Sequence, residues 1–144
     1  MRYEQSIVVN APADKVFAYV SDITKLSEWG GFGNVVRPTS QGEVGVGSSY
    51  ECDGKQFGKH TDNVTVTEYV PNKRFVSETK GDTGHSRNTF ELEEQGGTTK
   101  VTKVLEFIKP ALTTRLAGPV LKKMAPTNLG KDLERIKARI EGTA

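Results

Sequence analysis

The sequence has 144 residues, 35% hydrophobic and 26% charged, so we expect one domain over residues 1–144 with its own buried core. Its net charge of +2 is too small for a dedicated nucleic-acid binder, and its one cysteine, Cys52, excludes an internal disulfide. Because no apolar signal core and no run of 18 apolar residues is present, we expect a cytoplasmic protein without a transmembrane helix.

The first thirty residues predict a strand followed by two short helices. Residues 3–9 alternate in character, which is typical of a strand. An amphipathic helix starts near Pro12 and ends near residues 21–22. Apolar residues recur every third position over 23–29 and predict a second short helix, which ends at the glycines of 30–33.

From residue 34 to 109 the hydrophobic period is two, and turn residues recur every 10–15 positions. Six strands are predicted, at 35–39, 48–53, 63–70, 73–80, 85–94 and 98–108. In the third of these, alternation places Val64, Val66 and Val70 on one face. The short links between the strands predict one antiparallel meander.

The tail returns to helical spacing. We expect Pro119 and Pro126 to kink or interrupt its first half, so the clearest helix covers 127–141 and stops at Gly142. This long helix is the one element able to cover the inner face of a seven-stranded sheet. A strongly curved sheet around a single helix leaves space between them, which predicts a ligand cavity.

Charge is distributed unevenly along the chain. Residues 1–108 carry 12 Lys/Arg and 15 Asp/Glu, whereas residues 109–144 carry 8 and 3. Five basic residues and no acidic one lie between Glu106 and Asp132. Two interpretations remain open: a solvated helix face, or a basic rim that attracts acidic ligands or makes transient contact with an anionic membrane.

Several motifs along the chain form a family pattern. They are Ile7-x-Val9-x-Ala11-Pro12-x-x-x-Val16-Phe17, Asp22, Trp29, Gly45-x-Gly47, Val64-x-Val66-x-Glu68-x-x-Pro71-x-x-Arg74-Phe75, Phe90-x-Leu92 with Thr98/Thr99-x-Val101-Thr102, and Asp132-Leu133-x-x-Ile136-Lys137. Over residues 3–141 this pattern resembles the polyketide cyclase/dehydrase-like branch of the START-related SRPBCC (helix-grip) superfamily.

The resemblance implies an α+β helix-grip fold. A seven-stranded antiparallel curved sheet would wrap around a long C-terminal helix, with two short helices between strands 1 and 2 and a hydrophobic cavity inside. Members bind lipids, sterols, polyketides, quinones or plant hormones, and some are cyclases. The fold by itself does not select among these activities.

No general catalytic motif is present, and no cofactor is expected. The pairs Gly31-x-Gly33 and Gly45-x-Gly47 are too short for a dinucleotide fingerprint. His60 and His85 lie near turns without the further ligands of a metal site, so no metal is expected. Cys52 is interpreted as a small buried residue rather than a nucleophile.

The expected ligand site consists of inward apolar residues of the sheet and tail with a few polar ones. It comprises Trp29, Phe32, Val36, Tyr50, Val64, Val66, Phe75, Ser77, Asn88, Phe90, Leu105, Phe107, Leu116, Val120, Met124 and Leu129. Tyr50, Ser77 and His60 are the weak candidates for proton transfer.

Three classes of function fit these observations. The first is binding of a hydrophobic or amphipathic small molecule, such as a lipid, polyketide or aromatic compound, for transport, sensing or sequestration. The second is a polyketide cyclase or aromatase that acts in the same cavity. The third is an interaction module that docks a partner through exposed Trp29 and Phe32 or through the basic tail.

Overall fold

The computed structural model describes residues 1–31, 34–54, 59–82 and 84–142. The elements are β1 (Arg2–Val9), α1 (Ala13–Val20), the 3-10 turn η1 (Ile23–Lys25), α2 (Leu26–Trp29), β2 (Val35–Pro38), β3 (Ser49–Gly54), β4 (His60–Val70), β5 (Arg74–Gly81), β6 (Gly84–Gln95), β7 (Thr98–Pro110), α3 (Leu112–Leu116) and α4 (Gly118–Glu141). This order confirms the predicted strand, short helices, six strands and long helix. Within the described ranges, no helix combines the length and apolar character that a membrane-spanning segment needs.

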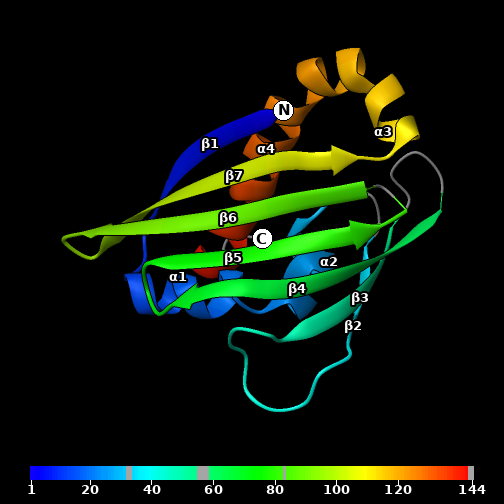
Figure 1. Cartoon of the computed structure of the whole chain (residues 1–144). Helices are drawn as coiled ribbons and strands as arrows, with labels where there is room; N and C mark the ends of the chain where they lie inside the picture. The colour runs from blue at the N-terminus through cyan, green and yellow to red at the C-terminus, as the bar shows by residue number, and fades with distance from the viewer. Residues whose placement is uncertain (32–33, 55–58, 83, 143–144) are drawn as a thin grey trace.

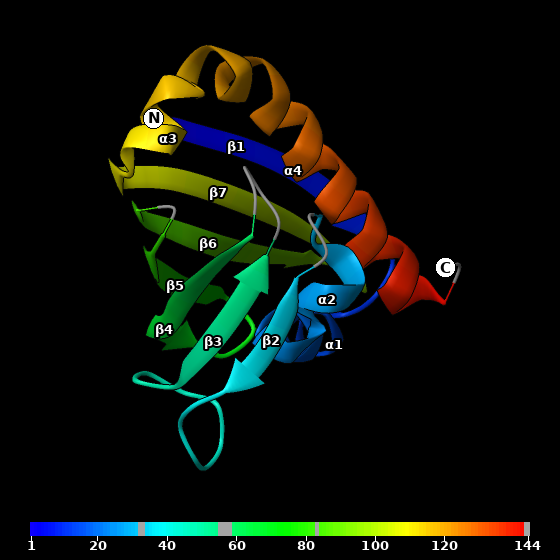
Figure 2. The ribbon, with the colours of Figure 1, turned by 90° about the vertical axis from the view of Figure 1, so that its right-hand side faces the viewer.

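The seven strands form one antiparallel sheet in the order β1-β7-β6-β5-β4-β3-β2. Strands β2 to β7 are a meander, and β1 closes the sheet on the far side of β7. The sheet curls around α4, with α1 and α2 at one end of its inner face (Figures 1 and 2). The expected α+β helix-grip fold is therefore confirmed.

The inner face of the sheet is packed solid at the end that meets α1. Phe75, Phe90, Leu92 and Val101 are buried there from β5, β6 and β7. They join side chains of α1 and of the C-terminal half of α4 in one core: Val16, Phe17, Val20, Leu133, Ile136 and Ile140. Opposed residues of adjacent strands have side chains on the same face of the sheet. Inward-facing cross-strand pairs therefore continue toward the end of the sheet away from α1, where they line the site described below.

A β-bulge in β4 changes which residues face the core. The register with β5 shifts between Val66 and Glu68, so one extra residue lies in β4. Tyr69 therefore turns inward, and its ring lies 5.2 Å from that of Phe17, measured between centroids. The prediction that Val70 shares the face of Val64 and Val66 is wrong, because the bulge reverses the alternation and leaves Val70 exposed.

The tail is interrupted just before Pro119, as predicted, because α3 ends at Leu116 and α4 starts at Gly118, but Pro126 does not interrupt the helix. Pro119 occupies the first turn of α4, where a missing N–H costs nothing, and Pro126 lies inside a helix that continues to Glu141. Leu129, Leu133 and Ile136 are buried against the sheet, and their packing holds the helix together despite the hydrogen bond that Pro126 cannot donate. The predicted stop at Gly142 is confirmed, since it caps the helix in the left-handed conformation with a φ of 75°.

Candidate functional site

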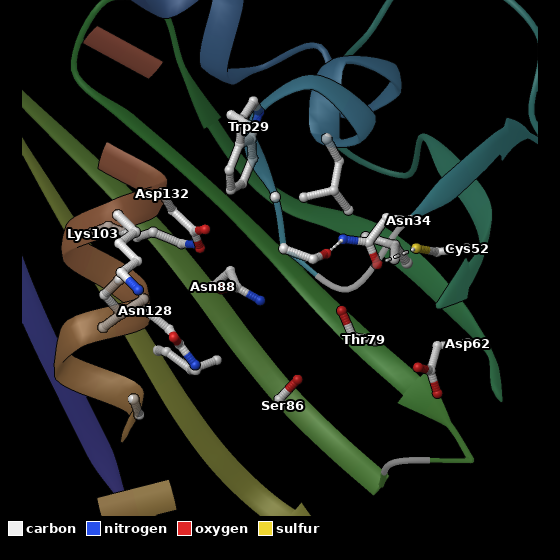
Figure 3. Close-up of a pocket in the computed structure, with 18 of the residues that line it drawn as sticks. Trp29, Asn34, Cys52, Asp62, Thr79, Ser86, Asn88, Lys103, Asn128 and Asp132 are labelled. Carbon is white, nitrogen blue, oxygen red and sulfur yellow. Dashed lines mark hydrogen bonds and ion pairs between the residues drawn. The ribbon is translucent and has the colours of Figure 1, made fainter. Parts of the chain in front are cut away.

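A cavity of about 340 Å³ lies between the sheet and α4. Its walls come from β3 to β7, α2, α3 and α4, and Figure 3 shows its labelled side chains around the open space. It is lined by Leu26, Trp29, Gly30, Gly31, Asn34, Cys52, His60, Asp62, Val64, Thr79, Ser86, Asn88, Lys103, Leu105, Phe107, Thr114, Leu121, Ala125, Asn128, Leu129, Lys131, Asp132 and Arg135.

Polar side chains line part of the sheet floor of this cavity. In the strand register Thr79 opposes Ser86, and Ser86 opposes Phe107. One row further along, Asn88 opposes Leu105. Thr79, Ser86 and Asn88 face the open space in Figure 3, and their side chains form no hydrogen bond with any described residue. These side chains are half-buried, so their polar atoms are available to water or to a polar ligand in the cavity.

A buried ion pair forms one end of the cavity. Lys103 falls on the inner face of β7 opposite Phe90, where it is 5% exposed. Its Nζ lies 3.1 Å from Asp132 Oδ2 on α4 and 4.6 Å from the ring centroid of Trp29. Arg135 lies 3.1 Å from the other carboxylate oxygen and also donates to the Trp29 carbonyl. Asp132 thus balances two cations and connects α4 to β7, while Arg135 connects α4 to the end of α2.

A second pair of titratable groups lies on β4. His60 and Asp62 are two residues apart and so share the inner face. His60 Nδ1 lies 2.9 Å from Asp62 Oδ2, yet neither ring nitrogen makes a hydrogen bond with a described residue. Gly54 lies opposite His60, and a Cβ there would lie 2.7 Å from the imidazole Cε1, so a larger residue would displace the ring.

Cys52 lines the cavity near this pair but is chemically inert. Burial raises the pKa of its thiol to about 11, and the charges of Asp62 and Asp53 add to the effect. The thiol therefore stays protonated at neutral pH, where a nucleophile would need the thiolate. This confirms the interpretation of Cys52 as a small buried residue.

The structure distributes the expected site residues between the cavity and the core. Those in the cavity lining are Trp29, His60, Val64, Asn88, Leu105, Phe107 and Leu129. Those packed in or against the core outside the lining are Val36, Tyr50, Val66, Phe75 and Phe90. Ser77 is half-buried on the inner face opposite Asn88 but outside the lining, and Phe32 lies outside the described residues.

Three expected tail residues do not reach the cavity. Leu116, Val120 and Met124 are exposed, whereas Leu121, Ala125 and Leu129 face inward. Since α4 passes uninterrupted through Pro126, the buried residues at 129 and 133 determine its rotation, and counting back by four reaches 125 and 121. Val120 and Met124 precede the inward-facing Leu121 and Ala125 by one residue each. One residue corresponds to a rotation of about 100° around the helix axis.

The sequence reasoning missed most of the polar lining. Lys103 is the clearest case, because it alternates with Val101, Leu105 and Phe107 in one strand and so had to share their inner face. Ser86 follows in the same way, because it opposes Thr79, which alternation already places on one face with Phe75 and Ser77. Asp132, Asn128 and Arg135 gave no such signal, because their places depend on the rotation of α4. Among the described residues, no group of three or more His, Cys, Asp or Glu side chains is arranged to hold a metal ion.

Residues 1–141 match the family model described as "Polyketide cyclase / dehydrase and lipid transport". The chain belongs to this family. The match covers nearly the whole sequence and confirms the resemblance inferred from its motifs. No match was found among curated proteins.

Solved structures share the fold at low sequence identity. A START superfamily protein from Mycobacterium smegmatis superposes with a TM-score of 0.80 at 17% identity, covering 99% of both chains. The Zhui aromatase/cyclase from Streptomyces sp. R1128 gives 0.79 at 16% identity, covering 98% of this chain and 93% of that one. The protein TTHA0849 from Thermus thermophilus gives 0.80 at 15% identity, covering 100% and 99%.

Proposed function

We propose that this protein binds a hydrophobic or amphipathic small molecule in the cavity between the sheet and α4. The observation that carries the proposal is a space of about 340 Å³ whose walls combine apolar side chains with polar groups that have no partner among the described residues. Ligand pockets have this composition, and their volumes run from about 300 to 1,000 Å³. The family description, which includes lipid transport, supports the same class of ligand.

The lining favours an amphipathic ligand over a pure hydrocarbon. Leu105 and Phe107 from the sheet and Leu121, Ala125 and Leu129 from α4 supply the apolar walls. Burying a ligand against them gains about 25 cal/mol per Å² of apolar surface. A hydrocarbon would leave Thr79, Ser86 and Asn88 without partners, whereas hydroxyl or carbonyl oxygens on the ligand would accept or donate hydrogen bonds there. A volume near the lower limit fits one ring system or one acyl chain.

Trp29 provides a direct test of binding. It is the single tryptophan of the chain and lines the cavity, so its fluorescence should change when a ligand enters. We expect the aromatic amphiphile 1-anilinonaphthalene-8-sulfonate to quench Trp29 with saturation. Ala125→Leu fills part of the cavity and should weaken binding about tenfold, because the added side chain takes space that the probe needs. Native mass spectrometry of protein from its own host should show a co-purifying small molecule.

The matched control is Ala18→Leu, which adds the same side chain at an exposed position on α1. It should leave the affinity unchanged. Equal affinity of wild type and Ala125→Leu, or no response of Trp29, would place the probe elsewhere and contradict the proposal.

A second candidate function is a cyclase or aromatase that acts in the same cavity. The observation that favours it is the presence of two pairs of titratable groups, His60 with Asp62 and Lys103 with Asp132, in one lining. Among Tyr50, Ser77 and His60, only His60 lies in that lining, so it is the acid–base residue of this hypothesis. One of the similar structures is named an aromatase/cyclase.

Turnover of a linear poly-β-ketone thioester separates the two functions. The cyclase hypothesis expects an aromatic product from the wild type and none from His60→Gln, with binding of the thioester retained. Binding without turnover by the wild type would leave ligand binding as the function.

A further inference from the structure

Four large apolar side chains project from α3 and the N-terminal half of α4 into solvent. Leu112, Leu116, Val120 and Met124 recur every fourth residue and are 67%, 74%, 52% and 47% exposed. We call these four residues the apolar stripe. Single exposed apolar residues are ordinary, but four in regular succession on adjoining helices are a mark of an interaction surface.

The packing of the same segment explains why the stripe is not core. Thr114, Leu121, Ala125 and Leu129 are the buried residues of this stretch, and all four line the cavity. The segment thus has a buried side and a separate apolar side. In Figure 2 it forms an arch at the edge of the sheet, so the stripe belongs to a projecting part of the molecule.

The charged residues of the chain segment that carries the stripe are all basic. Lys109, Arg115, Lys122, Lys123 and Lys131 are exposed, and none of them forms an ion pair with a described residue. No Asp or Glu occurs from residue 107 to residue 131. Lys123 directly precedes Met124 and follows Val120 by three residues, so it borders the stripe.

We propose that α3 and the N-terminal half of α4 dock onto an anionic lipid surface. Helices with an apolar face and flanking Lys or Arg lie in the membrane interface, with the apolar side chains at the headgroup–acyl boundary. Each basic residue near an anionic surface contributes about 1 kcal/mol to the attraction. A second copy of this chain is a poor occupant, since it would bring another five cations against these five.

The docking surface adjoins the cavity. Leu121, Ala125 and Leu129 form the cavity wall along the helix that carries Val120 and Met124. Docking therefore brings one wall of the cavity next to the lipid phase, where an amphipathic ligand enters or leaves. This route belongs to the proposed function, but docking itself does not depend on which ligand is bound.

Vesicle flotation with the full chain tests the proposal. Vesicles of phosphatidylcholine with about 30% phosphatidylglycerol should carry the protein, and vesicles of phosphatidylcholine alone should not. Raising the salt concentration from about 0.05 to 0.5 M should release most of the bound protein, because it shortens the screening length. Leu116→Ser/Val120→Ser and Lys122→Glu/Lys123→Glu should each lower the partition coefficient at least about tenfold.

Matched controls change the same chemistry elsewhere. Val46→Ser/Val70→Ser alters two exposed valines, and Lys15→Glu/Lys73→Glu reverses two exposed lysines outside the arch. Both should bind as the wild type does. Circular dichroism spectra that superpose for all variants would show that the folds are intact.

Two results would overturn the proposal. One is that the protein does not bind the vesicles, or binds them independently of anionic lipid, of salt and of the substitutions at residues 116, 120, 122 and 123. The other is a concentration-dependent dimer in analytical ultracentrifugation that Leu116→Ser/Val120→Ser abolishes, which would make the stripe a self-association surface. Because no ligand is used, a failure here leaves the Trp29 titration of the proposed function unaffected.

Discussion

Lys103 shows how one charged side chain is kept inside an apolar lining. Its ammonium lies between the ring of Trp29 and the carboxylate of Asp132, 29 residues away in the sequence. Burying a charge is costly unless a partner balances it, and here each carboxylate oxygen contacts one cation, from Lys103 or Arg135. The two partners are therefore unequal: Lys103 depends on Asp132, whereas Asp132 also has Arg135.

That inequality predicts asymmetric effects of substitution. Asp132→Asn leaves the buried ammonium without its counter-charge and should lower the free energy of unfolding by about 2–4 kcal/mol. Lys103→Met removes the buried charge, keeps apolar contact with Trp29 and leaves Asp132 paired with Arg135. It should cost about 1 kcal/mol or less. Urea denaturation followed by Trp29 fluorescence measures both.

Arg74→Gln serves as the control for this pair of variants. Arg74 bridges exposed Glu68 and Glu91 on the outer side of the sheet, where such pairs contribute about 1 kcal/mol or less. An Asp132→Asn variant as stable as Arg74→Gln, or less affected than Lys103→Met, would contradict the electrostatic account of the cavity end.

At the scale of the elements, backbone geometry matters as much as side chains. Gly84 opens β6 with a φ of 103°, and a Cβ there would lie against backbone atoms of Lys109 and Ala111, where β7 leads into α3. Gly130 lies inside α4, and a Cβ there would meet nothing within 4 Å. One glycine is thus required by the fold, while the other only weakens a helix.

Substitution of each glycine by alanine should therefore have opposite effects. Gly84→Ala should destabilise the fold by about 2–4 kcal/mol, through a strained φ and backbone overlap. Gly130→Ala should stabilise it by about 0.5–1 kcal/mol, because alanine loses less backbone entropy in a helix. Thermal unfolding by circular dichroism should show melting temperatures that move in opposite directions. A shift of the same sign for both variants would refute this assignment.

At the scale of the whole molecule, the end of α4 is tied to the end of β1. Glu141 Oε2 accepts a hydrogen bond from the Asn10 N–H at 2.8 Å and contacts Lys137 Nζ at 2.6 Å. Lys137 also donates to the Val8 carbonyl. The Asn10 hydrogen bond, and then Lys137, hold the pKa of Glu141 below its usual value of about 4.5.

This lowered pKa predicts a pH-dependent contribution to stability. Because the folded state favours the carboxylate, the contribution is complete above the unfolded pKa and is lost as the pH falls through the folded pKa. Glu141→Gln should therefore unfold at lower urea concentration than the wild type at about pH 7, and the difference should shrink toward zero on acidification. Glu134→Gln, at an exposed position of the same helix, should unfold at the same urea concentration as the wild type, both at about pH 7 and after acidification. A gap between Glu141→Gln and wild type that stays constant with pH would exclude this electrostatic tie.

The sequence by itself determined the order of the elements, the antiparallel meander and the family. These follow from local periodicity and turn residues, which act over a few positions: the alternation of residues 3–9 and 98–108 gives strands whatever lies beside them. It also predicted that Trp29, Asn88, Leu105 and Phe107 lie at the interior face, and they line the cavity. Whether they contact a ligand is a matter for the binding experiments.

Only the tertiary structure decided which side chains of α4 meet those of the sheet in the cavity. The bulge between Val66 and Glu68 reversed the face of Val70, because one extra residue changes every later position in a strand. The rotation of α4 placed Asp132 beside Lys103 and left Val120 and Met124 in solvent. Such choices depend on contacts between residues far apart in the sequence, and no local pattern encodes them.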